Sequence, residues 1–233
     1  MPYTKTILCL ANSRKPGGHC VAGREVVQQG FDAWVRPVSS RATREVSDDD
    51  ERYRDGSLPH LLDLIEIDFE IAVPDRHQQE NHQIDDKHYW KRCGIASWAD
   101  IPGLVEDVSG ELWLNGSSST YGENDRVQEA NLDRFTRSLY LVEPDDLALI
   151  VAEEGAQFGD PRRRVRAAFR LSGHSYTLGV TDLPIEQEYL AKPNGRYRIK
   201  GALVCVSLGE VFHGYAYKLA AGIITPQRTG RRQ

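Results

Sequence analysis

The feature that most constrains the fold is a strict alternation of apolar and acidic residues within residues 61–73 (LLDLIEIDFEIAV). Apolar side chains occupy the odd positions from Ile65 to Ile71, and Glu or Asp fills the even positions between them. Successive side chains of a strand point to opposite faces, so this period of two predicts a strand with one buried face. Other apolar runs, such as residues 147–152 and 202–208, are also of strand length, which favours a mainly β chain.

The length of the apolar runs indicates the location of the protein, and the spacing of its cysteines indicates their redox state. No segment approaches the roughly 18 apolar residues of a membrane-spanning helix, and residues 7–10 are too short an apolar core for a secretion signal. The four cysteines, Cys9, Cys20, Cys93 and Cys205, form no C-x-x-C pair. We therefore expect a cytoplasmic protein without membrane contact, whose cysteines are reduced and structural.

The chain has 233 residues, enough for two small domains with a core in each. Residues 115–122 (NGSSSTYG) have the composition of a flexible linker or a long exposed turn. We therefore predict one domain over residues 1–114 and a second over 123–225, followed by a basic tail over 226–233.

Turn residues separate short apolar segments throughout the chain. In the first domain we expect strands over residues 6–10 and 34–38, a strand or helical turn over 21–29, a charged loop over 48–54 and no regular pattern over 74–98. In the second domain we expect a helix from an Asn124 cap to Thr136, hairpins over 139–152 and 165–180, a short helix over 182–190, and strands over 198–208 and 215–224. This second set has the content of a small Greek-key barrel.

Charge is distributed unevenly along the chain. The net charge is −5, yet the first 44 residues carry seven Lys or Arg against two Asp or Glu, and residues 192–233 carry eight against one. Acidic residues are concentrated between these ends, with 14 in residues 45–86. Such segregation fits either an ordinary solvated surface or a basic face that contacts phosphates.

Residues 12–24 (NSRKPGGHCVAGR) combine three glycines with three cations, so that backbone N–H groups and guanidinium groups can meet one anion. The stretch is not a P-loop, because its glycines are followed by Arg-Glu and not by the Lys-Ser/Thr pair that holds phosphates and magnesium. The alternative is a tight turn with solvated cations. The candidate phosphate contacts here are Arg14, Lys15, Gly17, Gly18 and Arg24.

Two other segments place cations where nucleic acid can be bound. Trp34 and Arg36 lie close together, a pairing that suits single-stranded nucleic acid, whose bases stack on aromatic rings. The alternative is Trp34 in the core and Arg36 in an ion pair. Arg164 and Arg166 occupy alternate positions of a predicted strand and therefore point to one face, as a phosphate track or as the charged protection of an edge strand.

No motif predicts catalysis or metal binding. His77, His82 and His88 lie among acidic residues but lack the spacing of a metal site. There is no G-x-S-x-G motif, and no serine or cysteine stands in a recognisable frame with a histidine. We therefore expect no enzyme activity, metal or cofactor. The alternative is a hydrolase or nuclease with dispersed acidic ligands, for instance Asp63, Glu66 and Glu80.

Several blocks of the chain are similar to one protein family. They are residues 7–25 (ILCLANSRKPGGHCVAGRE), 34–39 (WVRPVS), 55–56, 61–67 (LLDLIEI), 79–85 (QENHQID), 180–182, 206–208 and 217–224 (YKLAAGII). Together they resemble the bacterial dual OB-containing proteins and span nearly the whole chain. The resemblance implies two OB-like barrels in tandem, which bind oligonucleotides or other ligands across an exposed sheet face. It also implies a binding module that serves in prokaryotic conflict or defence systems, and it carries over no site residue.

We therefore predict a mainly β protein of two tandem OB-like barrels that binds single-stranded DNA or RNA on one basic surface, without catalysis. The residues expected to contact the nucleic acid are Arg14, Lys15, Gly17, Gly18, Arg24, Trp34, Arg36, Arg164, Arg166 and Lys218. The alternatives are a sensor whose glycine loop holds one nucleotide phosphate in a pocket, and a scaffold for protein partners from a shared operon.

Overall fold

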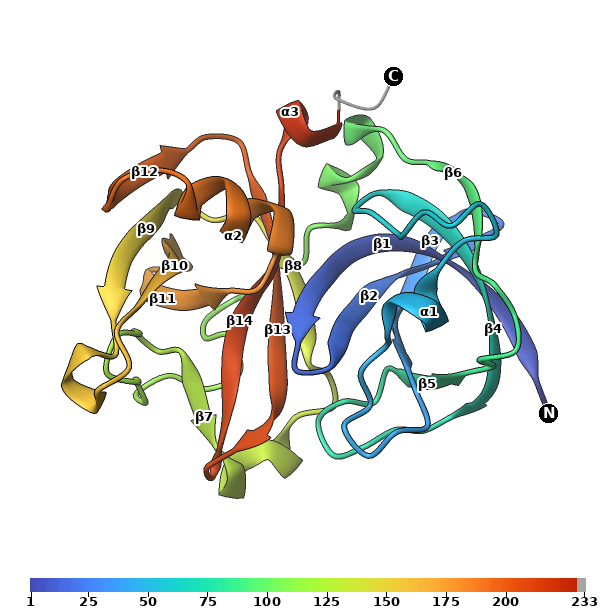
Figure 1. The fold of residues 1–233 in the computed structure, drawn as a ribbon, viewed down its shortest axis with the longest axis horizontal. Coiled ribbons are helices and arrows are strands. Elements are labelled where there is room, and N and C mark those ends of the chain that lie inside the picture. Colours follow the sequence, from blue (N-terminus) through green and yellow to red (C-terminus); the bar gives the residue numbers. More distant parts are fainter. Residues whose placement is uncertain (230–233) are drawn as a thin grey trace.

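The computed structural model describes residues 1–229 and shows two β-barrels side by side (Figure 1). The elements of the first barrel are β1 (Tyr3–Lys15), β2 (Gly18–Val27), β3 (Gly30–Val38), α1 (Asp48–Glu51), β4 (Asp63–Ala72), β5 (Asn81–Ile84) and β6 (Lys91–Ile95). Their order in the sheet is β1-β2-β3-β5-β4-β6, and β1 also pairs with β4, so the sheet closes on itself. Strands β3 and β5 run parallel, whereas the other neighbours are antiparallel.

The alternating segment forms β4, as predicted. Its odd residues Ile65, Ile67 and Phe69 are buried, and Ile65 lies opposite Ile7 of β1. Ile71, at the end of the strand, is 54% exposed, so the predicted buried face ends at Phe69. Two expectations for this barrel are wrong. The charged loop contains α1, which begins at the capping residue Ser47, and the segment without a pattern contains β5 and β6. These two strands escape a search for alternation because β5 has four residues and β6 buries none of its side chains.

The second barrel repeats this strand order. Its elements are β7 (Arg126–Gln128), η3 (Glu129–Arg134), β8 (Leu139–Val142), β9 (Asp146–Glu154), η4 (Ala156–Phe158), β10 (Arg162–Leu171), β11 (His174–Val180), α2 (Leu183–Leu190), β12 (Gly195–Ile199), β13 (Leu203–Phe212), β14 (Tyr215–Ile224) and α3 (Pro226–Thr229). The sheet order is β12-β9-β10-β11-β14-β13-β8, with β7 paired to β14. Only residues 200–202 separate β12 from β13, so together they act as one bent strand that closes the barrel. Two tandem OB-like barrels are therefore present.

Local predictions for the second barrel succeed where the partner is close in sequence. The hairpin of β10 and β11 is confirmed, as is α2, where the Asp182 side chain accepts a hydrogen bond from the Ile185 N–H (3.3 Å). The helix after Asn124 is wrong, because this segment forms β7 against β14 and the 3₁₀ helix η3. The hairpin over residues 139–152 is also wrong, because β8 pairs with β13 and β9 pairs with β10 and β12.

Residues 96–125 connect the barrels and include two short 3₁₀ helices, η1 (Trp98–Asp100) and η2 (Pro102–Leu104). The predicted linker, residues 115–122, is hydrogen-bonded to its surroundings, for example from Ser119 to the Asp125 carboxylate. The predicted tail begins with α3, where Arg228 pairs with Asp182 (2.6 Å), and residues 230–233 lie outside the described residues. Within residues 1–229, no helix has the length and apolarity needed to cross a membrane.

The barrels meet along β1 and β14 and across a continuous apolar cluster. Leu8, Leu10 and Trp34 of the first barrel pack there with side chains of the second, which include Leu139, Leu141, Leu203 and Ile224. Gly222 brings the two backbones together, since a Cβ at this position would lie 2.2 Å from the carbonyl oxygen of Leu10. The barrels are therefore packed backbone against backbone at this point, with β13 and β14 beside the first barrel in Figure 1.

Candidate functional site

OB-like barrels bind ligands across their second and third strands and on the loops that join strands one to two and four to five. In the first barrel these parts are β2, β3, the turn after Lys15 and residues 73–80. Each of these two loops is joined to the second barrel. Lys15 pairs with Glu210 (2.6 Å), the His77 ring bonds the Gly209 carbonyl oxygen (3.0 Å), and Gln78 donates to the Leu208 carbonyl (3.3 Å). The usual ligand face of the first barrel is therefore covered.

Arg36 is the centre of this covered face. Its side chain is 4% exposed and pairs with the buried Glu80 (3.2 Å). It also donates to the hydroxyls of Ser138 (2.7 Å) and Ser207 (3.3 Å) in the second barrel. The prediction that Arg36 lies on an exposed basic surface is therefore wrong, because its guanidinium group is buried inside the interface.

Trp34 and Arg24 are also held away from a ligand. Trp34 is buried in the apolar cluster, and its indole N–H donates to Glu106 (3.1 Å). The Arg24 guanidinium lies 5.6 Å from the Trp34 ring centroid and 3.7 Å from Glu106. The core alternative that the sequence allows for Trp34 is the one that the structure adopts.

Lys218 points into the second barrel. The even residues of β14 from Ala216 to Ala220 face inward, so Lys218 lies between the buried Ala216 and Ala220 and is fully buried. Its Nζ donates to the Leu114 carbonyl (2.9 Å) and to Asn115 Oδ1 (3.0 Å). Desolvation lowers the pKa of Lys218 to about 7. The expected contact between Lys218 and nucleic acid is therefore wrong.

The glycine loop is explained by packing. Gly17 has a φ of 86°, which favours glycine, and a Cβ on Gly18 would lie 2.3 Å from the Val46 carbonyl oxygen. The space beside Gly17 contains the Glu45 carboxylate, an unfavourable neighbour for a phosphate. Gly17 and Gly18 thus form a tight turn against residues 45–46, and the expected phosphate cradle is not formed.

The corresponding face of the second barrel is open. It is a cleft of about 590 Å³ between β10, β11 and β14, with the loop of residues 155–161 and the end of β13 as its rims. Phe158 on one rim is 71% exposed and Phe212 on the other is 63% exposed. Tyr121 and Tyr217 also line the cleft. We call these four aromatic residues and their surroundings the aromatic cleft.

Three of the predicted arginines meet in the aromatic cleft. Arg166 makes a two-bond pair with Glu154 (2.6 and 2.8 Å), and Arg14 reaches across from the first barrel to pair with Glu186 (3.1 and 3.2 Å). Arg164 has no side-chain hydrogen bond or ion pair within residues 1–229. The sequence predicts that Arg14, Arg164 and Arg166 lie on one surface, and in the structure all three line this cleft.

The aromatic cleft is nevertheless balanced in charge. Its three arginines are matched by three lining carboxylates, which are Glu154, Asp160 and Glu186. Together with the burial of Arg36 and Lys218, this balance overturns the expectation of one continuous basic surface. What remains is a short aromatic site with one unpaired cation.

Sequence reasoning missed Phe158 and Phe212. Both stand beside glycines in turns, Phe158 next to Gly159 and Phe212 two residues before Gly214. A large apolar side chain at a turn between two strands has no core face to occupy, and this is the signal that could have identified them.

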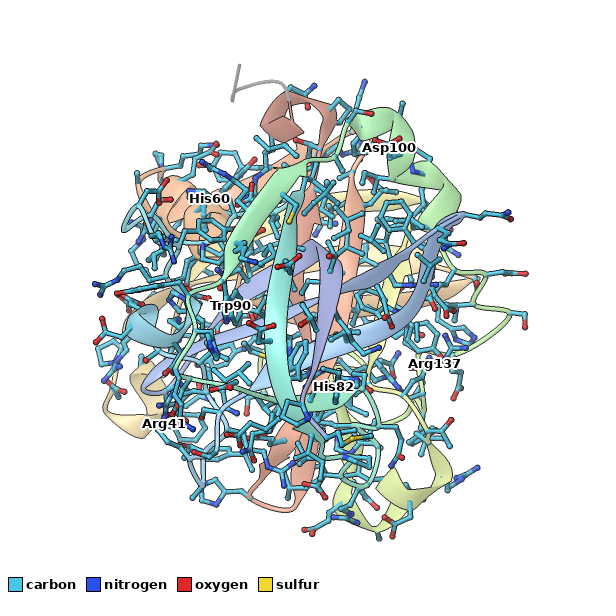
Figure 2. All side chains as sticks on the ribbon, turned by 90° about the vertical axis from the view of Figure 1, so that its right-hand side faces the viewer. Arg41, His60, His82, Trp90, Asp100 and Arg137 are labelled. Atoms are coloured by element: carbon cyan, nitrogen blue, oxygen red, sulfur yellow. The ribbon has the colours of Figure 1, made fainter. Side chains whose placement is uncertain are left out.

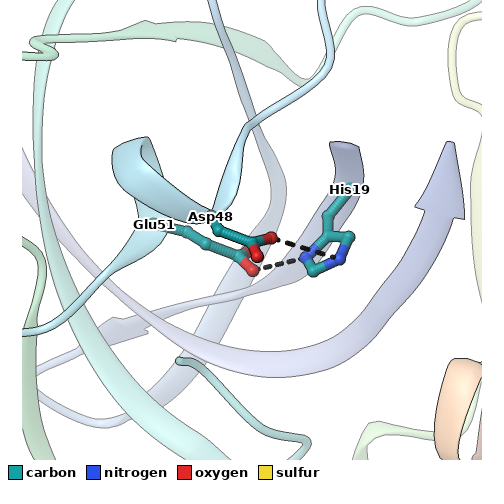
Figure 3. Close-up of side chains that lie close together, drawn as sticks. All are labelled: His19, Asp48 and Glu51. Carbon is teal, nitrogen blue, oxygen red and sulfur yellow. Dashed lines mark hydrogen bonds and ion pairs between the residues drawn. The ribbon is translucent and has the colours of Figure 1, made fainter. Parts of the chain in front are cut away.

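The described residues contain one group with the geometry of possible metal ligands, His19, Asp48 and Glu51 (Figure 3). The His19 Nδ1 contacts the buried Glu51 carboxylate, and Nε2 lies 3.7 Å from Asp48. The hydrogen bond to Glu51 raises the pKa of His19, which favours the protonated ring between β2 and α1. A metal can be held only if that proton is lost.

The other polar residues considered from sequence do not converge. His77, His82 and His88 contact Gly209, Tyr3 and Asp85 respectively. Among the acidic residues, Asp63 accepts from the Tyr53 hydroxyl, Glu66 pairs with Lys91 and Glu80 pairs with Arg36. Each of these six side chains therefore has a separate structural partner.

The comparisons with known proteins agree with the barrel topology. The family model for the dual OB-containing domain matches residues 5–223, which include every strand of the two closed barrels apart from the ends of β1 and β14. No curated protein and no solved structure matches the chain. With two barrels of one strand order and a match over nearly its whole length, the chain belongs to the dual OB-containing domain family.

Proposed function

We propose that the protein binds a short stretch of single-stranded nucleic acid in the aromatic cleft, as a binding module and not as an enzyme. The observation that carries this proposal is the pair of exposed rings, Phe158 and Phe212, on the two rims of an open OB-like ligand face. Bases stack on such rings whatever their sequence, with about 1–3 kcal/mol for each base.

The charges of the cleft suit one to three phosphates. Arg164 is free to meet a phosphate directly. Arg166 and Arg14 can do so if the phosphate replaces Glu154 or Glu186, because phosphate and carboxylate accept the same two-bond pairing from a guanidinium group. Single-strand binding loses affinity with salt at a log–log slope of about −0.7 for each neutralised phosphate. We expect a shallow slope, between about −0.7 and −2.

Fluorescence anisotropy with labelled single-stranded DNA and RNA oligonucleotides tests the proposal. The Phe158→Ala variant should bind roughly 5- to 150-fold more weakly, which corresponds to the loss of one stacked base. The matched control is Ile71→Ala, since Ile71 is also exposed (54%) but lies on the first barrel. Equal affinity of wild type and Phe158→Ala, or no binding at all, would contradict the proposal.

The charge balance of the cleft favours a mononucleotide as the second candidate ligand. Its volume is that of a small-molecule site, and one unpaired arginine suffices for one phosphate group. A thermal-shift titration separates the two candidates. Saturable stabilisation by mononucleotides with no added effect of longer oligonucleotides would favour the sensor, whereas affinity that rises from one to several nucleotides supports the strand.

A further inference from the structure

We propose that the first barrel carries a second ligand site, for a nucleoside phosphate, in a hollow formed by residues 53–55 and 87–92. This site lies outside the aromatic cleft and does not depend on the function proposed for it. The hollow has a volume of about 770 Å³ and lies on the barrel that faces the viewer in Figure 2, where Trp90 is labelled.

Aromatic side chains supply the floor and one rim of the hollow. Tyr53 and Trp90 are buried and are joined by a bridge between their backbones. Tyr89, their neighbour on the chain, is 57% exposed. A planar base can stack on the exposed ring of Tyr89 while the two buried rings close the site from below.

Cations exceed carboxylates around the hollow, unlike in the aromatic cleft. The lining includes four cations, Arg54, Lys87, Lys91 and Arg92, and two carboxylates, Asp55 and Asp68. Lys91 pairs with Glu66 (2.5 Å), and Arg92 is only loosely placed beside Asp55 (3.9 Å). The side chains of Arg54 and Lys87 have no ion-pair or hydrogen-bond partner in the described part of the chain.

Trp90, which lines the hollow, also carries a buried polar group without a partner within residues 1–229. The Trp90 Nε1–H is buried and has no hydrogen-bond acceptor among the described residues. Leaving such a donor unpaired is unfavourable by about 1–3 kcal/mol. A ligand with acceptor oxygens would pair with the free cations Arg54 and Lys87, and a stacked base would use Tyr89. Phosphate and base in one molecule are therefore the chemistry that the hollow fits.

Isothermal titration calorimetry with ADP as the probe tests the site on the full chain. We expect saturable binding that falls by at least about tenfold in the Arg54→Ala/Lys87→Ala double variant, since hydrogen bonds to charged groups are lost. Both side chains are exposed and unpaired, so their removal should leave the fold intact. Tyr89→Ala should weaken ADP binding about fivefold or more through lost stacking.

Two controls assign the binding to this hollow. Ile71→Ala, at an exposed residue of the same barrel that does not line the hollow, should bind ADP as the wild type does. Pyrophosphate should bind more weakly than ADP, because it cannot stack. The proposal is overturned if ADP shows no saturable binding, if the double variant keeps wild-type affinity, or if pyrophosphate binds as tightly as ADP. None of these results depends on whether the aromatic cleft binds a strand.

Discussion

The two barrels have one strand order but opposite relations to solvent. On the first barrel, the face where such barrels hold ligands is pressed against its neighbour, with Arg36 and Trp34 inside the contact. On the second barrel, the same face is open and presents Phe158 and Phe212. Topology alone therefore does not identify a binding face. The side chains on it, and what covers them, decide whether it can meet a ligand.

The largest expected effect comes from removing the ion pair between Arg36 and Glu80 on the covered face of the first barrel. Replacing Arg36 leaves the buried Glu80 carboxylate without its cation, and such losses are unfavourable by about 3–5 kcal/mol. Urea unfolding of Arg36→Met should show this decrease in the free energy of unfolding. The double variant Arg36→Met/Glu80→Met should recover most of it, because no buried charge remains. A loss below about 1 kcal/mol in the single variant would mean that the network does not hold the barrels together.

The second effect is a pH dependence of stability that comes from Lys218, which is buried inside the second barrel. Lys218 has a folded-state pKa of about 7, below that of an unfolded lysine, about 10.4. Between these values the unfolded chain binds more protons, so the free energy of unfolding should rise with pH, by about 1 kcal/mol per pH unit. The Lys218→Met variant should lack this rise. Thermal unfolding of both proteins from pH 7 to 9 measures the difference, and parallel pH profiles would show that Lys218 is not buried as a neutral amine.

A third effect concerns the seam between the barrels. In Gly222→Ala the new methyl group would lie 2.2 Å from the Leu10 carbonyl oxygen, so the strands must separate, at a cost of about 1–2 kcal/mol. Gly209→Ala is the control, because its nearest atom would be 3.5 Å away. Calorimetry should show a lower Tm for Gly222→Ala alone. Equal Tm values would indicate that β1 and β14 do not touch in solution.

The smallest effect tests the open face. Arg164→Gln removes one unpaired cation from the aromatic cleft, and we expect oligonucleotide affinity to fall several-fold with a salt slope shallower by about 0.7. Arg170→Gln is a matched control, since Arg170 is an exposed arginine of β10 that does not line the cleft. The proposal for Arg164 fails if both variants have the same salt slope.

Sequence reasoning succeeded where partners are near in the chain. The alternation in β4, the turn between β10 and β11, and the Asp182 cap of α2 are all local signals. The pairing of β8 with β13 is not, because it joins segments about sixty residues apart. Periodicity identifies a strand without naming its neighbour.

Contacts with residues far away in the sequence also explain which of the predicted site residues are exposed. Arg36 and Arg164 are each an arginine on a strand, and their neighbours in the sequence do not reveal which of them is buried. Arg36 meets Glu80 and two serines of the other barrel, while Arg164 meets solvent in a cleft. Their different fates are decided by contacts with distant residues. Convergence of Arg14 with Arg164 and Arg166 could be proposed from charge alone, but their pairing with carboxylates could not.

Arg14 connects ligand binding in the aromatic cleft to the contact between the two barrels. It belongs to the first barrel, yet its guanidinium group helps to wall the cavity of the second and is tethered there by Glu186. A molecule that draws Arg14 away from Glu186 exchanges one inter-barrel link for a bond to itself. By thermodynamic reciprocity, whatever loosens or tightens the joint must then alter how firmly that molecule is retained.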